Sequence, residues 1–133
     1  MSYHNTSLNT PLKKVRGLGS AKDGTAHWWA QRVTAVLLVP LCFWFVSSLL
    51  NHVVGKDRQA VAEWFSSPVV AICWLVLLTA AFYHAKLGMQ VIIEDYVHTP
   101  CKKTALLIGN ILFFSILTIV SWTAILKLHM MGI

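Results

Sequence analysis

The residues best suited to chemistry lie in one apolar stretch, which contains His84 and ends at Asp95 and Tyr96. Of the six histidines, only His84 lies well inside such a stretch. A neutral imidazole can form hydrogen bonds or bind a metal ion. Because an ionisable group inside a membrane is costly, one that is found there is a functional candidate. His84 is therefore the first candidate for a functional residue, provided that the stretch spans a membrane.

Gly88 follows His84 by four residues, so on a helix the two residues lie on the same face. A glycine one turn away from a histidine leaves a flat recess. A large planar ligand such as a porphyrin needs this space if an imidazole nitrogen is to bind its iron. The spacing makes His84 a candidate ligand of haem iron. The alternative is a histidine that only forms a hydrogen bond between membrane helices.

Asp95 follows His84 by eleven residues, so on a helix it returns to almost the same face about 16 Å further along. Tyr96 is the next residue. One helix would then carry a metal ligand within the span, and a carboxylate and a phenol that can form hydrogen bonds at its edge. Considered alone, Asp95 and Tyr96 are also typical of ordinary residues at a membrane interface.

A low-spin haem that transfers electrons needs two axial ligands. No other histidine of the sequence lies at the depth of His84. We therefore expect a second ligand to come from another membrane subunit.

The composition indicates a membrane around this stretch. Of the 133 residues, 56% are hydrophobic and 12% are charged, against about 25% charged residues in a typical soluble domain. This composition excludes an ordinary soluble domain and a disordered chain. Three segments, 33–55, 64–85 and 104–126, contain no Asp, Glu, Lys or Arg. Each is longer than the roughly 20 residues with which a helix crosses the hydrocarbon core of a bilayer.

The sequence therefore predicts an all-α membrane protein with three transmembrane helices, at about 28–52, 67–97 and 103–128. A chain of 133 residues is too short to bury three such helices in a soluble core. Pro40 is expected to kink the first helix or to be accommodated by a neighbour. Ser67 can cap the second, with Pro68 in its first turn. Residues 1–26 are predicted to form a polar, basic arm, and residues 27–133 the three-helix anchor domain.

The basic residues predict the orientation. The N-terminal segment and the second loop contain seven Lys and Arg residues, against three in the first loop and the C-terminus. By the positive-inside rule, the N-terminus lies in the cytoplasm and the C-terminus in the periplasm. The net charge of +6 is then mainly a topology signal, and we expect no nucleic-acid partner. Residues 1–26 contain no apolar signal sequence, which favours a multi-pass protein of the bacterial inner membrane.

Two segments of the sequence resemble a known family. The pattern His84-Ala85-x-x-Gly88-Met89-Gln90-Val91-x-x-x-Asp95-Tyr96-Val97 resembles the second helix of the small membrane-anchor subunit of succinate dehydrogenase, the D subunit of respiratory complex II. The earlier Gly19-Ser20-Ala21-Lys22-Asp23-Gly24-Thr25-x-His27-Trp28-Trp29-x-Gln31-Arg32-x-Thr34-Ala35 resembles the N-terminal motif of its alphaproteobacterial branch.

The resemblance implies a role for four residues. His84 matches the axial ligand that this subunit contributes to haem b, the other histidine coming from the large cytochrome subunit. Tyr96 matches a tyrosine that donates a hydrogen bond to a ubiquinone carbonyl, and Asp95 an acid of the quinone pocket. Arg32 matches a basic residue near a haem propionate or in the charge network of the quinone site.

The resemblance also implies partners and a reaction. The flavoprotein and iron–sulfur subunits carry electrons from succinate to ubiquinone, linking the tricarboxylic acid cycle to the respiratory chain. The dehydrogenase centre then lies on other subunits, and this chain supplies the anchor within the lipid. The alternatives are the anchor of a fumarate reductase and a haem-free membrane protein with a structural or small-transporter role.

Overall fold

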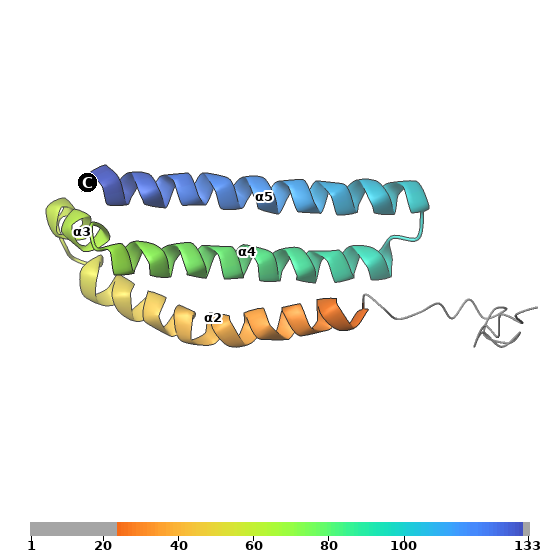
Figure 1. The fold of residues 1–133 in the computed structure, drawn as a ribbon, viewed down its shortest axis with the longest axis horizontal. Coiled ribbons are helices and arrows are strands. Elements are labelled where there is room, and N and C mark those ends of the chain that lie inside the picture. The colour runs from red at the N-terminus through yellow and green to blue at the C-terminus, as the bar shows by residue number, and fades with distance from the viewer. Residues whose placement is uncertain (1–23, 132–133) are drawn as a thin grey trace, which may run out of the picture.

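The computed structural model describes residues 24–131, which form four helices and no strand (Figure 1). They are α2 (Gly24–His52), α3 (Arg58–Phe65), α4 (Pro68–Tyr96) and α5 (Pro100–Met131). The helices α2, α4 and α5 are each long and apolar enough to cross a membrane. The prediction of an all-helical protein with three membrane-spanning helices is therefore confirmed. Most of the predicted arm lies outside the described residues.

The three long helices form a single layer with α4 in the middle (Figure 1). α4 contacts both α2 and α5, whereas α2 and α5 do not contact each other. The start of α2, the end of α4 and the start of α5 lie together at one end of the layer, which we call the Tyr96 end. The short helix α3 and the end of α5 lie at the opposite end, which we call the α3 end (Figure 1).

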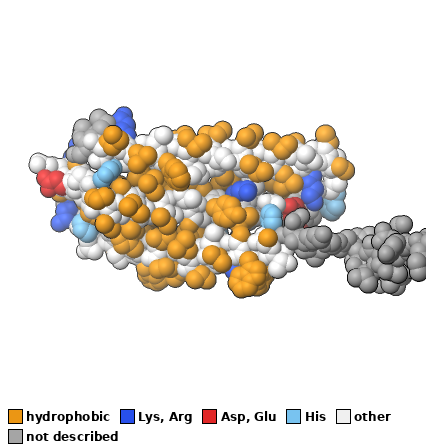
Figure 2. Space-filling model, in the orientation of Figure 1, with side chains coloured by type: hydrophobic (Ala, Val, Ile, Leu, Met, Phe, Trp, Pro, Cys, Tyr) orange, Lys and Arg blue, Asp and Glu red, His pale blue; other side chains and the backbone are white. Residues whose placement is uncertain are grey.

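Burial is concentrated on the central helix. Six apolar residues of α4 are buried, namely Val70, Ala71, Leu77, Ala80, Leu87 and Ile93. The buried residues of the outer helices are only Ser48 on α2, and Asn110 and Ile125 on α5. Large hydrophobic side chains stay exposed along the outer helices and cover most of the face in Figure 2. A surface of this kind needs lipid or other membrane helices against it.

The helix boundaries follow the local sequence closely. α4 begins at Pro68 directly after Ser67, although the Ser67 side chain makes no capping hydrogen bond. α2 begins four residues before Trp28, and it continues through Pro40 with a visible curve (Figure 1). A proline within a helix removes one backbone hydrogen bond, which permits such bending.

The short helix α3 was not predicted. Asp57 caps its start, because the Asp57 carboxylate accepts a hydrogen bond from the backbone N–H of Ala60 at 3.2 Å. Ala62 is buried where α3 contacts the long helices. At the other side, the Phe65 carbonyl lies 3.2 Å from Nδ1 of His129 on α5. The segment is short and charged, so its sequence is equally typical of a loop between two spans.

Polar side chains join α5 to α4 inside the apolar layer. Nε1 of Trp122 donates to Oγ1 of Thr79 at 2.9 Å, and Nδ2 of Asn110 donates to the carbonyl of Lys86 at 3.0 Å. Hydrogen bonds between membrane helices are worth about 0.6 kcal/mol on average. These two contacts hold the register of α5 against α4 at positions on either side of His84.

Gly55 makes the turn after α2 possible, and its substitution gives a test of the fold. It has a φ of 72°, which is costly for residues with a side chain. Gly55→Ala is expected to lower the free energy of unfolding of the full chain in detergent micelles by about 1 kcal/mol. Gly109→Ala is the control, since Gly109 is helical and has open space around it. An equal loss in both variants would contradict the assignment.

Candidate functional site

His84 lies on α4 with its ring directed at α2. Its Nδ1 is 2.9 Å from Oγ1 of Thr34, and its Nε2 is 3.3 Å from Nε2 of Gln31. The ring is half-buried, and both of its nitrogen atoms have a polar neighbour. His84 is thus the residue through which α4 forms side-chain hydrogen bonds to α2 in the described part of the chain.

Gln31 and Thr34 are site residues that the sequence did not single out. Both occur in the N-terminal motif that resembles the family, but the motif alone assigns them no role. They precede His84 by 53 and 50 residues. Helical periodicity places them on one side of α2, but it does not reveal which helix lies against that side.

The space beside Gly88 contains the amide of Gln31. A Cβ atom on Gly88 would lie 3.6 Å from Nε2 of Gln31, which is an ordinary van der Waals distance. The predicted flat recess is therefore covered by one side chain from α2. The Oε1 atom of that amide is buried and has no hydrogen-bond partner in the described structure. An unpaired buried oxygen is unfavourable, so the Gln31 amide is weakly held in this position.

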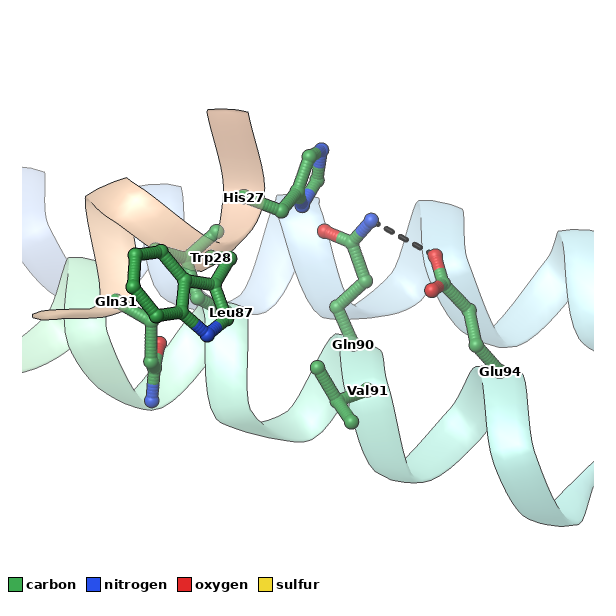
Figure 3. Close-up of a pocket in the computed structure, with 7 residues that line it drawn as sticks. All are labelled: His27, Trp28, Gln31, Leu87, Gln90, Val91 and Glu94. Carbon is green, nitrogen blue, oxygen red and sulfur yellow. Dashed lines mark hydrogen bonds between the residues drawn. The ribbon is translucent and has the colours of Figure 1, made fainter. Parts of the chain in front are cut away.

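A groove of about 590 Å³ lies between the start of α2 and the last turns of α4, toward the Tyr96 end, and this amide is part of its lining (Figure 3). The side chains that line it are His27, Trp28 and Gln31 from α2, and Leu87, Gln90, Val91 and Glu94 from α4. Nε2 of Gln90 donates to Oε1 of Glu94 at 2.9 Å along one wall. Gln31 lines the groove and also contacts Nε2 of His84, whereas His84 itself is not a lining residue. His27, Gln90 and Glu94 were not predicted to line a groove.

Asp95 and Tyr96 form the end of α4 and are both exposed, Tyr96 by 79%. At about 100° per residue, Asp95 lies about 20° around the helix from His84, and Tyr96 about 120°. The helical rise separates both residues from His84 by about 16 Å or more. The described chain therefore offers two separate places for chemistry, one at His84 and one at the Tyr96 end.

Arg32 lies near the start of α2 and is exposed. Its guanidinium carbon is 4.1 Å from the centre of the Trp28 ring, a cation–π contact. Because Trp28 lines the groove, Arg32 is linked to the groove through this ring. No carboxylate within the described residues forms a salt bridge with it, so its hydrogen-bond donors are free to bind an anion from elsewhere.

Lys86 is the one Lys or Arg residue between the ends of α4, and it is half-buried. Its Nζ lies 5.4 Å from the centre of the Tyr83 ring. Tyr83 precedes Lys86 by one turn, on the side away from the Tyr96 end. The ammonium group thus lies toward the middle of the span.

The donor set is consistent with a haem ligand. No group of three or more His, Cys, Asp or Glu side chains among residues 24–131 could hold a metal ion. A metal at His84 would need its other ligands from outside these residues, and a porphyrin with a histidine from another chain supplies them. The Gln31 amide lies between Nε2 and the groove and has one unpaired atom, so its displacement would open Nε2 to the groove, and the residues present fit such a group.

The three apolar helices of the layer define a multi-pass membrane protein. The hydrogen-bonded histidine on its central helix is a candidate cofactor site. Residues 6–120 match the family model described as the succinate dehydrogenase/fumarate reductase transmembrane subunit. The chain therefore belongs to this family, and the resemblance noted in the sequence is confirmed.

Similar proteins agree with this assignment. A relative from Rickettsia bellii is 38% identical, and the alignment covers 84% of this chain and 87% of the relative. A relative from Rickettsia prowazekii is 34% identical, over 82% of this chain and 86% of the relative. A relative from Paracoccus denitrificans is 28% identical, over 93% of this chain and 92% of the relative. All three are named succinate dehydrogenase hydrophobic membrane anchor subunit. No solved structure is a significant match.

Proposed function

We propose that this chain is the membrane anchor of a succinate:ubiquinone oxidoreductase and supplies one axial ligand of haem b. The observation that carries the proposal is His84, a half-buried histidine within a helix long and apolar enough to span a membrane, whose Nε2 contacts a residue that lines a groove. The family match and the names of the relatives support the assignment to the complex.

The second axial ligand comes from a partner, the large cytochrome b subunit. The single layer supports this, because α2 and α5 flank α4 and no other long helix among residues 24–131 covers its two remaining faces. Haem, when bound, supplies one-electron redox chemistry. The chain itself positions Nε2 of His84 through the contacts of the ring with Thr34 and Gln31 on α2.

The end of α4 is proposed to form part of the ubiquinone site. The Tyr96 phenol can donate a hydrogen bond to a quinone carbonyl, and its exposure leaves it free to meet a ligand held between subunits. Reduction of a quinone also consumes two protons. The Asp95 carboxylate is exposed at the same end and can connect the site to bulk protons.

Arg32 is proposed to bind an anion next to these sites. Its guanidinium is exposed and is oriented by the Trp28 ring. A haem propionate or an anionic group of the quinone site would pair with it.

The Tyr96 end is proposed to face the cytoplasm, with the α3 end in the periplasm and the helices in the inner membrane. Lys102 and Lys103 begin α5 at the Tyr96 end, as the positive-inside rule requires. The flavoprotein and iron–sulfur subunits would bind at this end, because electrons must reach the quinone site from them.

A fumarate reductase anchor is the second candidate, since the family description includes both enzymes. The two enzymes catalyse the same reaction in opposite directions. A haem-free transporter receives no support from the family match.

Replacing His84 tests the haem assignment. His84→Ala is expected to abolish or shift the b-type absorption in the reduced-minus-oxidised spectrum of the purified complex, because iron loses a ligand. His52→Ala is the control, since His52 lies at the α3 end, stacked on Trp64. A normal spectrum in His84→Ala would remove this residue as the ligand.

Replacing Tyr96 tests the quinone site. Tyr96→Phe removes only the hydroxyl, and quinone reduction is expected to fall about tenfold, the equivalent of about 1.4 kcal/mol for one hydrogen bond. Succinate oxidation by an artificial acceptor should not change. Tyr83→Phe serves as the control, because Tyr83 lies more than three turns further into α4. Equal quinone turnover in Tyr96→Phe and the native complex would refute the role of the phenol.

The orientation is tested with a membrane-impermeant thiol reagent. Ser66→Cys places an exposed thiol at the α3 end. It is expected to react in intact cells, whereas the native Cys101 at the start of α5 should react only after the cells are opened. Reaction of Ser66→Cys only after opening would indicate the reverse orientation.

A further inference from the structure

The contacts of His84 specify where its proton lies. Nε2 of Gln31 is an amide nitrogen, which can donate a hydrogen bond but cannot accept one. With the amide in this orientation, Nε2 of His84 lies 3.3 Å from a donor and presents a lone pair to it. A neutral imidazole with a lone pair on Nε2 carries its proton on Nδ1.

The contacts of Thr34 agree with this assignment. Its hydroxyl has a single proton, which it donates to the carbonyl of Ala30 at 2.8 Å. The Thr34 oxygen then accepts a hydrogen bond from Nδ1–H of His84 at 2.9 Å. One set of proton positions therefore accounts for both ring nitrogens of His84 and for the Thr34 hydroxyl, and this set is the tautomer with the proton on Nδ1.

We propose that Thr34 is a positioning residue that holds His84 in the Nδ1–H tautomer, with Nε2 ready for iron, and that Gln31 occupies the iron position until haem binds. The inference rests on the proposed function, because it concerns the ligand named there. A histidine that binds a metal generally donates its second N–H to a fixed acceptor, which orients the ring and raises the basicity of the ligand atom. Here that acceptor is a threonine on the neighbouring helix.

The surroundings of Gln31 allow it to leave. Its amide forms one hydrogen bond to His84, and its Oε1 is buried without a partner. The groove lies on its other side and has room for the displaced side chain. Gly88 adds space, because a larger residue there would contact the amide. While haem is absent, Gln31 keeps Nε2 from being an unpaired polar atom within the membrane.

The first test compares threonine variants in the haem-loaded complex. Thr34→Val keeps the shape but removes the acceptor, and the loss of haem to excess apomyoglobin is expected to become about tenfold faster, since losing such a partner weakens metal binding roughly 10- to 100-fold. The electron paramagnetic resonance spectrum of the ferric haem should also shift. Thr34→Ser, which restores the hydroxyl, should behave as the native protein.

Thr118→Val is the matched control. Thr118 donates a hydrogen bond to the carbonyl of Phe114 at 2.7 Å, as Thr34 does to Ala30, but within residues 24–131 it forms no hydrogen bond with a histidine. Its haem retention and resonance spectrum should be native. If Thr34→Val behaves like Thr118→Val while His84→Ala abolishes the haem spectrum, the role of Thr34 is refuted and the haem ligand stands. If His84→Ala also leaves the spectrum normal, the proposed function itself has failed.

The second test needs no haem. Nitrogen NMR of the full chain with labelled histidine, in detergent micelles, should show His84 with a protonated Nδ1 and an unprotonated Nε2. The opposite tautomer would overturn the inference. Gln31→Leu should change the Nε2 signal yet leave the resonance spectrum of the haem-loaded complex native. A shift in that spectrum as large as in Thr34→Val would contradict the proposal that Gln31 only holds the iron position.

Discussion

The need of a chain in lipid to pair its own backbone groups governs this structure. It requires three long helices, and short connections at alternating ends then make neighbouring helices antiparallel (Figure 1). With α4 between α2 and α5, every polar contact between the long helices includes α4. Trp122 and Asn110 reach it from α5, and Gln31 and Thr34 reach it from α2.

The same constraint explains why His84 is so fully bonded. An unpaired imidazole within the apolar layer would be costly, and two side chains of α2 remove that cost. The pairing also restricts the register of α2 against α4, since a shift by one turn would separate Thr34 from Nδ1. The same two contacts therefore fix both the packing of α2 against α4 and the orientation of the proposed haem ligand.

Because the helices form a single layer, both faces of the layer remain uncovered by other long helices of the described residues. Its outer helices are largely exposed, and the side chains of Tyr96 and Arg32 near the Tyr96 end are exposed as well. These features agree with a family whose name describes a transmembrane subunit. Lipid and partner subunits are expected to cover what this chain leaves uncovered.

The sequence by itself determined the helical class, the three spans and the place of His84, because a lack of charge over more than 20 residues and the period of the helix are local properties. The helical period also predicted that Asp95 lies on the same face of its helix as His84, whereas Tyr96 lies on a different face. The tertiary structure decided the layer order, the helix α3, the groove, and the pairing of His84 with Thr34 and Gln31. The physical reason is that a helix pattern reports which residues share a face, whereas the helix that covers this face comes from residues about 50 positions away.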